Sequence, residues 1–358
     1  FTEEIKPSHR YIPEIKKWIV FQNSQWKFIN EDEVNTSALE FFQKEAEYIS
    51  QINDQEQRTS QIREFKRHAK SSTVNNIVRL ASLMLKQSAD ELDKDQYCLG
   101  ATNGWLNLKN NTFLGPDPLK MITKSVKSDF VTNAEAQLWE KILQDIFEGD
   151  QSLIDFFQRA VGYSLLGDTK EQCLFICHGS GANGKSVILE TIKDILGDYA
   201  QTMPIEILLK GKKNVGAASP ETARLKGIRF ALASESERGQ RWSSSLVKQL
   251  TGGDTITARH LYGDIFEFKS EATIWITSNF KPRVDALDDA MWRRMILIPF
   301  NRIFSDKERD YDLSDKLKKE YSGILKWMVD GLKKYNEIGL NKPEKILNAV
   351  SEYRREMD

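Results

Sequence analysis

A glycine-rich segment contains the residues whose types and spacing most clearly predict chemistry. It fits the pattern G-x-x-x-x-G-K-[ST] through Gly179, Gly184, Lys185 and Ser186. Glycines let consecutive backbone N–H groups converge on a phosphate, and the start of a following helix adds partial positive charge. The lysine of such a loop reaches the β- and γ-phosphates, and the hydroxyl completes the coordination of Mg²⁺. The segment therefore predicts a site for a nucleoside triphosphate, with the binding residues Gly179, Ser180, Gly181, Ala182, Asn183, Gly184, Lys185, Ser186 and Val187.

Two acidic residues, Glu235 and Glu237, follow the apolar run "IRFALAS". Triphosphate hydrolysis needs carboxylates that hold the metal ion through water and draw a proton from the attacking water. Without other evidence, two glutamates after a strand more often belong to a solvated loop than to a catalytic site. Together with the phosphate loop they are predicted to be the metal and base residues, so that Ser186 and Glu235 are the expected protein ligands of Mg²⁺.

Asn279, Arg293 and Arg294 are the next polar residues with a predicted role. Asn279 ends the run "TIWITSN", where an amide either caps a turn or orients the attacking water beside the γ-phosphate. The segment "WRRM" places the two arginines before the last apolar run. They form ordinary surface ion pairs, or one of them is an arginine finger that enters the site of a neighbouring copy. A finger of this kind works only in an oligomer.

The block "TITARHLYGDIFEF" predicts two short strands with Arg259, His260 and Tyr262 near the tip. One interpretation is a hairpin that contacts another protein. The other is a nucleic-acid contact, because cations bind the phosphate backbone and flat rings pack on sugars or bases.

The elements that must position these residues alternate between apolar runs and helical segments. The runs 173–177, 228–234, 272–279 and 295–300 predict strands, and 187–196 and 243–250 predict helices. This alternation indicates an α/β fold with a mostly parallel sheet flanked by helices. Before it lies a mixed α+β region, and the segment after Asp312 reads as helical. That first region is predicted to contain a hairpin around Asn23-Ser24, a polar helical stretch from about 36 to 61, a helix over 73–86, and paired strands around an Asn-Asn turn in 103–115. After Pro116 and Pro118, two amphipathic helices over 134–147 and 152–166 lead into the first strand of the next unit.

The bulk composition excludes several classes of protein. The 358 residues carry a net charge of -1, and no run of 18 apolar residues is present, so a membrane-spanning protein is not expected. The three cysteines are too few and badly spaced for a zinc site, which fits a reducing cytoplasm. The net charge neither indicates nor excludes nucleic acid. The chain opens with Phe1 and shows no signal pattern, so it is expected to be a piece of a longer protein.

In order and spacing, the segments "GSGANGKS", "RFALASESE", "LTGGDTITARHLYGDIFEFK", "IWITSN" and "DDAMWRRMILIPF" resemble the superfamily 3 helicases of the AAA+ class. The resemblance is closest to the phage, plasmid and poxvirus primase-helicase branch. It implies an N-terminal accessory domain over 1–130, an ATPase domain over 131–300 and a C-terminal helical lid over 301–358. It covers residues 105–358 well and the first hundred weakly.

The resemblance implies a hexameric ring that uses ATP and Mg²⁺ to pull one strand of forked DNA through its centre, with 3′ to 5′ polarity. Lys185 and Ser186 then take the phosphate-loop roles, Glu235 and Glu237 the metal and base roles, Asn279 the sensor role, and Arg293 or Arg294 the finger role. Arg259 and His260 grip DNA. Ser236 separates the two glutamates, whereas many relatives have adjacent acids, so which one is the base stays open.

Three functions are compatible with these patterns. The first is a replicative DNA helicase of a mobile element, phage or plasmid, with any primase or origin-binding domain outside this chain. The second is an ATP-dependent initiator that binds and melts an origin without processive unwinding. The third is a nucleotide-dependent scaffold or defence ATPase that handles no nucleic acid.

Overall fold

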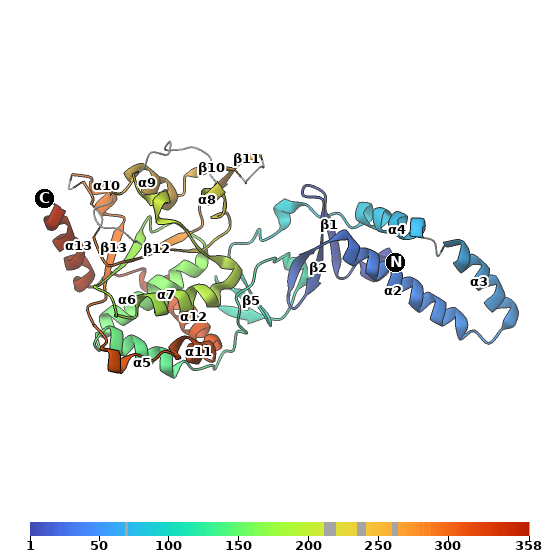
Figure 1. Ribbon diagram of the computed structural model, residues 1–358, viewed down its shortest axis with the longest axis horizontal. Helices are drawn as coiled ribbons and strands as arrows, with labels where there is room; N and C mark the ends of the chain where they lie inside the picture. The colour runs from blue at the N-terminus through green and yellow to red at the C-terminus, as the bar shows by residue number, and fades with distance from the viewer. Residues whose placement is uncertain are drawn as a thin grey trace. The chain divides into compact units, whose positions relative to one another are not determined.

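The computed structural model describes residues 1–68, 71–210, 220–234, 241–259, 264–281, 283–285 and 287–357. The chain forms two compact units (Figure 1). The first comprises residues 1–100 and 115–124, and the second comprises residues 101–114 and 125–358. All described residues of the predicted nucleotide site belong to the second unit.

A three-stranded antiparallel sheet and three long helices build the first unit. The sheet has the order β1-β2-β3, with β1 His9–Ile12, β2 Lys17–Gln22 and β3 Gln25–Ile29. The predicted hairpin at Asn23-Ser24 is confirmed, because both residues have positive φ (49° and 67°), as a tight two-residue turn requires. The remaining elements are α1 (Thr2–Ile5), α2 (Glu31–Ser50), α3 (Gln55–His68), α4 (Ser71–Met84), η1 (Ala89–Glu91), β4 (Cys98–Ala101) and η2 (Pro118–Lys120).

The polar helical stretch expected from about 36 to 61 is confirmed, but it forms two helices. The chain leaves the helical path after α2, and α3 begins anew with Asp54 accepting a hydrogen bond from the backbone N–H of Gln57 at 2.8 Å. A carboxylate in this position satisfies a free amide at a helix start, so it favours a new helix over continuation.

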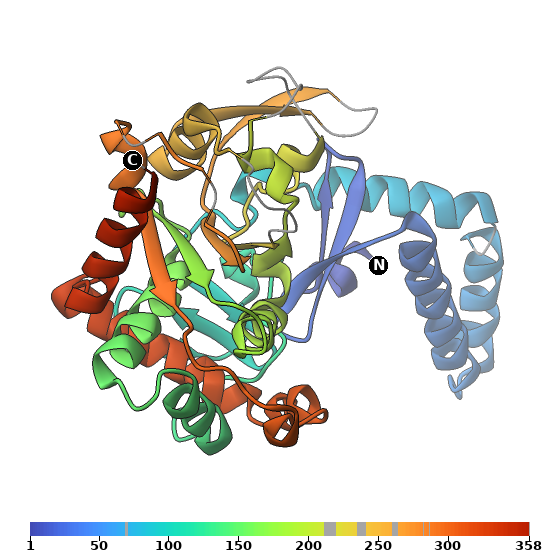
Figure 2. The same cartoon turned by 60° about the vertical axis from the view of Figure 1, so that its left-hand side comes forward.

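A five-stranded parallel sheet forms the centre of the second unit, in the order β13-β7-β12-β9-β8. The strands are β7 (Leu174–His178), β8 (Ala200–Thr202), β9 (Phe230–Ser234), β12 (Thr273–Ser278) and β13 (Met295–Pro299), and every pairing is parallel. Helices flank this sheet (Figure 2). The predicted α/β class with a parallel sheet is therefore confirmed.

The order of the strands brings three predicted segments to one edge. Strand β12, which leads to Asn279, lies between β7, which leads to the phosphate loop, and β9, which leads to Glu235. Since the strands are parallel, their carboxyl ends meet at the same edge, where open α/β sheets bind ligands.

Aromatic residues fix the three central strands to one another and to α6 (Gln151–Tyr163). Trp275 stacks on Phe175 with ring centroids 4.4 Å apart, and its Nε1 donates to the Ser164 hydroxyl at 3.0 Å. Helix α12 (Tyr321–Ile338) packs along α6, and Gly162 has no room for a Cβ, which would lie 2.2 Å from the Leu332 backbone nitrogen. This close contact joins the C-terminal helices to the sheet.

The other elements of the second unit are shorter or lie nearer its surface. They are β5 (Gly104–Asn107) and β6 (Thr112–Leu114), which form an antiparallel pair, α5 (Gln137–Ile146), η3 (Ser164–Leu166), α7 (Lys185–Leu196), η4 (Gly197–Tyr199), η5 (Ile205–Leu208), α8 (Pro220–Ala223), α9 (Ser244–Gly252), β10 (Thr255–Arg259), β11 (Ile265–Lys269), α10 (Asp289–Trp292), η6 (Asp306–Glu308), α11 (Leu313–Lys318) and α13 (Glu344–Met357). Within the described ranges, no helix is both long enough and apolar enough to cross a bilayer.

A candidate nucleotide site at the edge of the parallel sheet

The glycine-rich loop connects the end of β7 to the start of α7, as the sequence predicts. Gly181 and Ala182 both have positive φ (100° and 51°), and Gly184 caps α7 with φ 79°. At Gly179 a Cβ would lie 2.2 Å from the Phe300 carbonyl oxygen, so only glycine fits there. The loop thus turns sharply into a helix N-terminus, where free backbone amides favour a bound anion.

The segment that follows β13 supports this loop from one side. The Asn183 amide, 3% exposed, donates to the Phe300 carbonyl oxygen at 3.2 Å. The backbone N–H of Phe304 donates to the Ala182 carbonyl oxygen at 2.8 Å. These contacts hold the loop in shape, a role for Asn183 that the glycine-and-lysine pattern does not reveal.

Lys185 is the charged group at the centre of the site. Its Nζ donates to the Gly179 carbonyl oxygen at 2.6 Å, to Asn183 Oδ1 at 2.9 Å and to Asn279 Oδ1 at 3.2 Å. Lys185 is 5% exposed, and burial lowers its pKa. The structure thus brings together Lys185 and Asn279, which are 94 residues apart.

The acceptors around this ammonium group are all neutral oxygens, and no carboxylate pairs with it among the described residues. A buried charge held without a counter-ion is costly, and an anion beside it reduces that cost. The residues present therefore fit a phosphate group.

A cavity of about 430 Å³ opens beside Lys185. Its walls are residues 181–187 of the loop and helix start together with Ser234, Thr277, Ser278 and Asn279 at the ends of β9 and β12. The Thr277 hydroxyl lies 2.9 Å from the Ser234 hydroxyl. The predicted residues Glu235 and Glu237 lie outside the described residues, but Ser234, directly before Glu235, is part of the wall.

A second, largely apolar cavity of about 450 Å³ shares Ala182, Gly184 and Val187 with the first. Its remaining walls come from α5 and from the segment after β13; among them are Leu138, Ile142, Ile146, Phe304, Tyr311 and Leu313. The sequence predicts α5 as an amphipathic helix but not that its apolar face reaches the phosphate loop. Only the packed fold brings these two segments together.

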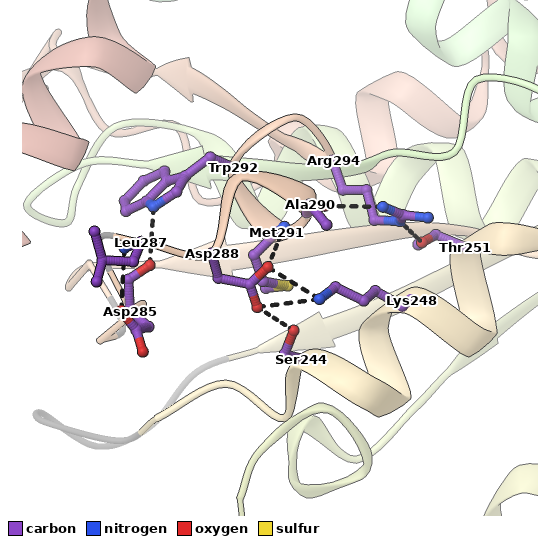
Figure 3. Close-up of polar contacts among 10 residues, drawn as sticks. All are labelled: Ser244, Lys248, Thr251, Asp285, Leu287, Asp288, Ala290, Met291, Trp292 and Arg294. Atoms are coloured by element: carbon purple, nitrogen blue, oxygen red, sulfur yellow. Dashed lines mark hydrogen bonds and ion pairs between the residues drawn. The ribbon is translucent and has the colours of Figure 1, made fainter.

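The two adjacent arginines of "WRRM" point to different surroundings. Arg293 is exposed, whereas Arg294 is 7% exposed. The Arg294 guanidinium donates to the Ala290 carbonyl oxygen at 2.8 Å and to the Thr251 hydroxyl at 3.2 Å (Figure 3). These contacts use donors of Arg294 within the subunit. Arg293 is the exposed member of the pair, so the finger role stays a prediction that fits Arg293 better than Arg294.

Asp288 holds the short helix α10, which precedes Arg293, against α9 (Figure 3). Its carboxylate accepts hydrogen bonds from Lys248 Nζ at 2.9 and 3.2 Å, from the Met291 backbone N–H at 3.1 Å and from the Ser244 hydroxyl. Burial alone would raise the pKa of Asp288, but the hydrogen bonds from Ser244 and Lys248 outweigh it and lower the pKa. Sequence reasoning missed this residue, although an aspartate three residues before Met291 is a typical helix cap.

The predicted hairpin is confirmed as the antiparallel pair β10–β11, joined to α9 through Gly253 and Asp254. Arg259 ends β10 and is exposed. The other two residues predicted at the tip, His260 and Tyr262, lie outside the described residues.

Comparisons with known proteins find similarity to viral proteins named as putative helicases and as a putative primase. Residues 1–148 match the family described as D5 N terminal like, and residues 177–294 match a family of unknown function (DUF5906). The chain is 29% identical to "Putative helicase L207/L206" of Acanthamoeba polyphaga mimivirus over 75% of this chain and 30% of that protein. It is 26% identical to "Putative helicase 022R" of Frog virus 3 (isolate Goorha), over 58% of this chain and 23% of that protein. It is 25% identical to "Putative primase C962R" of African swine fever virus (isolate Tick/Malawi/Lil 20-1/1983), over 76% of this chain and 31% of that protein.

The chain therefore spans less than a third of the length of these relatives. Among solved structures, the apo C-terminal region of NrS-1 shares the fold, with a TM-score of 0.54 and 12% identity over 96% of this chain and 71% of that one. Both family matches and the viral relatives agree with the residue motifs, and the chain is consistent with the D5-like primase-helicase branch of superfamily 3.

Proposed function

We propose that this chain is the ATP-hydrolysing motor of a viral-type replicative DNA helicase. The observation that carries the proposal is the buried Lys185 ammonium, which lies at a helix N-terminus and beside a cavity. Among the described residues, this ammonium has no carboxylate partner. The triphosphate of ATP supplies the missing negative charge. Similarity to viral proteins named as helicases supports the same class of enzyme.

Each part of the nucleotide has residues suited to it. Lys185 and the amides at the start of α7 would hold the phosphates, and the apolar cavity beside α5 would take the base. Ser186 is exposed at the start of α7 and would contribute a hydroxyl to Mg²⁺, together with Glu235 or Glu237. Bound Mg²⁺ would neutralise charge on the phosphates. This part of the proposal therefore depends on the two glutamates, which lie outside the described residues.

Hydrolysis in this proposal is completed between copies of the chain. Asn279, which contacts Lys185 at 3.2 Å, is suited to orient the attacking water, and Arg293 would stabilise charge in the site of a neighbour. A ring of such copies, hexameric by the family resemblance, would pull single-stranded DNA in the 3′ to 5′ direction. The β10–β11 hairpin with Arg259 would grip that strand. The protein would act in the cytoplasm.

A strand-displacement assay tests this proposal. Forked DNA with either a 3′ or a 5′ single-stranded tail is incubated with ATP and Mg²⁺, and the released strand is measured. The proposal expects release from the 3′-tailed fork by the wild-type chain and none by Lys185→Ala. ATP hydrolysis without displacement on either fork would favour an initiator that melts DNA locally.

A further inference from the structure

Three basic residues, Lys210, Arg241 and Arg283, form a row across three short extended segments. Leu209 pairs antiparallel with Trp242, and Arg241 pairs parallel with Arg283. The Lys210 backbone N–H donates to the Arg241 carbonyl oxygen at 2.8 Å, and the Trp242 backbone N–H donates to the Arg283 carbonyl oxygen at 3.2 Å. This register sets Lys210 opposite Arg241 and Arg241 opposite Arg283. Residues opposite one another across paired strands project to the same face.

This arrangement is unfavourable unless an anion is present. Like charges directly opposite each other in paired strands are destabilising. All three residues are exposed, and none of their side chains has a carboxylate within ion-pair distance in the described part of the chain. Their combined charge is thus available to a ligand.

The acidic residues nearby do not cancel this charge. Asp288 is engaged by Lys248 at 2.9 Å, and Glu356 is engaged by Lys281 at 2.6 Å. Among the described residues that line the hollow, Asp285 is the one acidic residue left, with Oδ1 accepting from the Leu287 backbone N–H at 3.1 Å. The row of three cations therefore keeps a positive excess.

A hollow of about 840 Å³ lies along the row and is lined by all three cations. Its lining also includes the buried side chains of Trp242, Val284 and Met291. Charges beside buried apolar side chains attract an anion more strongly than charges fully surrounded by water. The planar fork of an arginine matches the oxygens of a phosphoryl group in geometry as well as in charge.

We propose that this hollow, which we call the basic hollow, binds phosphoryl groups. It shares no lining residue with the Lys185 cavity. Its lining includes Met291 of α10, the helix that directly precedes Arg293. The phosphoryl groups come from a single-stranded nucleic acid or from a nucleotide bound to another copy of the chain. The second source, but not the first, rests on the function proposed above.

Two measurements on one variant separate the sources. The double substitution Arg241→Gln and Arg283→Gln removes two of the three cations, and Lys319→Gln, which removes an exposed cation elsewhere, is the matched control. Binding of fluorescein-labelled oligothymidylate, without nucleotide, is followed by anisotropy over a series of NaCl concentrations. Hydrolysis of ATP with Mg²⁺ is measured without nucleic acid. Thermal denaturation verifies that each variant is folded, and Arg241→Lys with Arg283→Lys keeps the charge.

If the strand is the source, the slope of log affinity against log salt falls in magnitude by about 0.7 per cation removed, hence about 1.4 for the double variant. ATP hydrolysis without nucleic acid then stays unchanged. If the nucleotide is the source, ATP hydrolysis falls at least tenfold while the salt slope stays unchanged. In both cases the lysine variant retains most of the wild-type behaviour.

A folded double variant that matches Lys319→Gln in both measurements overturns the proposal, as does a wild-type chain that binds no oligothymidylate and hydrolyses no ATP. Wild-type strand binding with a reduced slope in the variant, but without ATP hydrolysis, upholds the basic hollow and contradicts the proposed motor.

Discussion

Replacing Asp288 by alanine is expected to loosen the α9–α10 contact that precedes Arg293. The change removes a helix cap worth about 1 kcal/mol and hydrogen bonds to a charged lysine worth about 1.5 kcal/mol. We therefore expect the free energy of unfolding to fall by about 2–3 kcal/mol, and Tm to fall by roughly 4–12 °C for a unit of this size. Asp288→Asn keeps a side-chain acceptor for the Met291 N–H and loses the charge. It should therefore lower the free energy of unfolding by about half as much as Asp288→Ala.

The pH dependence gives a second readout of the same contact. Because the pKa of Asp288 is lowered in the folded protein, its stabilising effect is fully present above the pKa of an unfolded aspartate, about 3.9. That effect is lost as the pH falls through the lower, folded pKa. The stability difference between wild type and Asp288→Asn should therefore shrink as the solution is acidified.

Thermal and urea denaturation across a pH series measure both effects. Asp306→Ala serves as the control, because its ion pair with Arg309 is exposed (85% for the aspartate side chain) and contributes little. Two results would refute the role assigned to this carboxylate. One is a stability loss for Asp288→Ala no larger than that for Asp306→Ala. The other is a stability difference between wild type and Asp288→Asn that does not change with pH.

Three other predictions concern the site and its surroundings. Gly179→Ala should abolish nucleotide binding, because the added Cβ would lie 2.2 Å from the Phe300 carbonyl oxygen. The Cβ of Gly181→Ala meets no atom within 4 Å, so this variant should lose only about 1 kcal/mol of stability from its positive φ. Equal effects of the two variants in a fluorescent-ATP titration would contradict this. Arg294→Ala should lower the free energy of unfolding by about 2–4 kcal/mol, as measured by denaturation. Arg293→Ala should leave the free energy of unfolding unchanged but reduce steady-state ATP hydrolysis by about 10³-fold. The reverse pattern would exchange the roles of the two arginines. Arg259→Ala should spare ATP hydrolysis without DNA and reduce strand displacement, and equal losses in both assays would make the hairpin a structural element.

The sequence predicts the phosphate-binding region well because its requirements are local. Gly179 and Gly184 fit where a side chain would collide with a neighbour, and Lys185 begins a helix directly after a buried strand. The hairpin at Asn23-Ser24 is equally local, since a two-residue turn depends on the φ values of those residues alone. Such features need no knowledge of the rest of the chain.

Other features depend on contacts between distant segments and could not be predicted. Which arginine of "WRRM" is buried depends on Thr251, 43 residues away, which binds Arg294. The row formed by Lys210, Arg241 and Arg283 exists because three segments after different strands pair with one another. Hydrophobic periodicity describes one segment at a time, so it cannot predict a contact between distant segments.

Equilibrium binding of a fluorescent ATP analogue with Mg²⁺ tests the central claim most directly. The claim is that the buried Lys185 ammonium binds the phosphates of ATP. The wild-type chain should bind the analogue, and unlabelled ATP should displace it. Lys185→Met, which keeps an unbranched side chain but removes the charge, should weaken binding at least tenfold while remaining folded. Equal affinity of the folded variant and the wild type, or no displacement by ATP, would contradict the account.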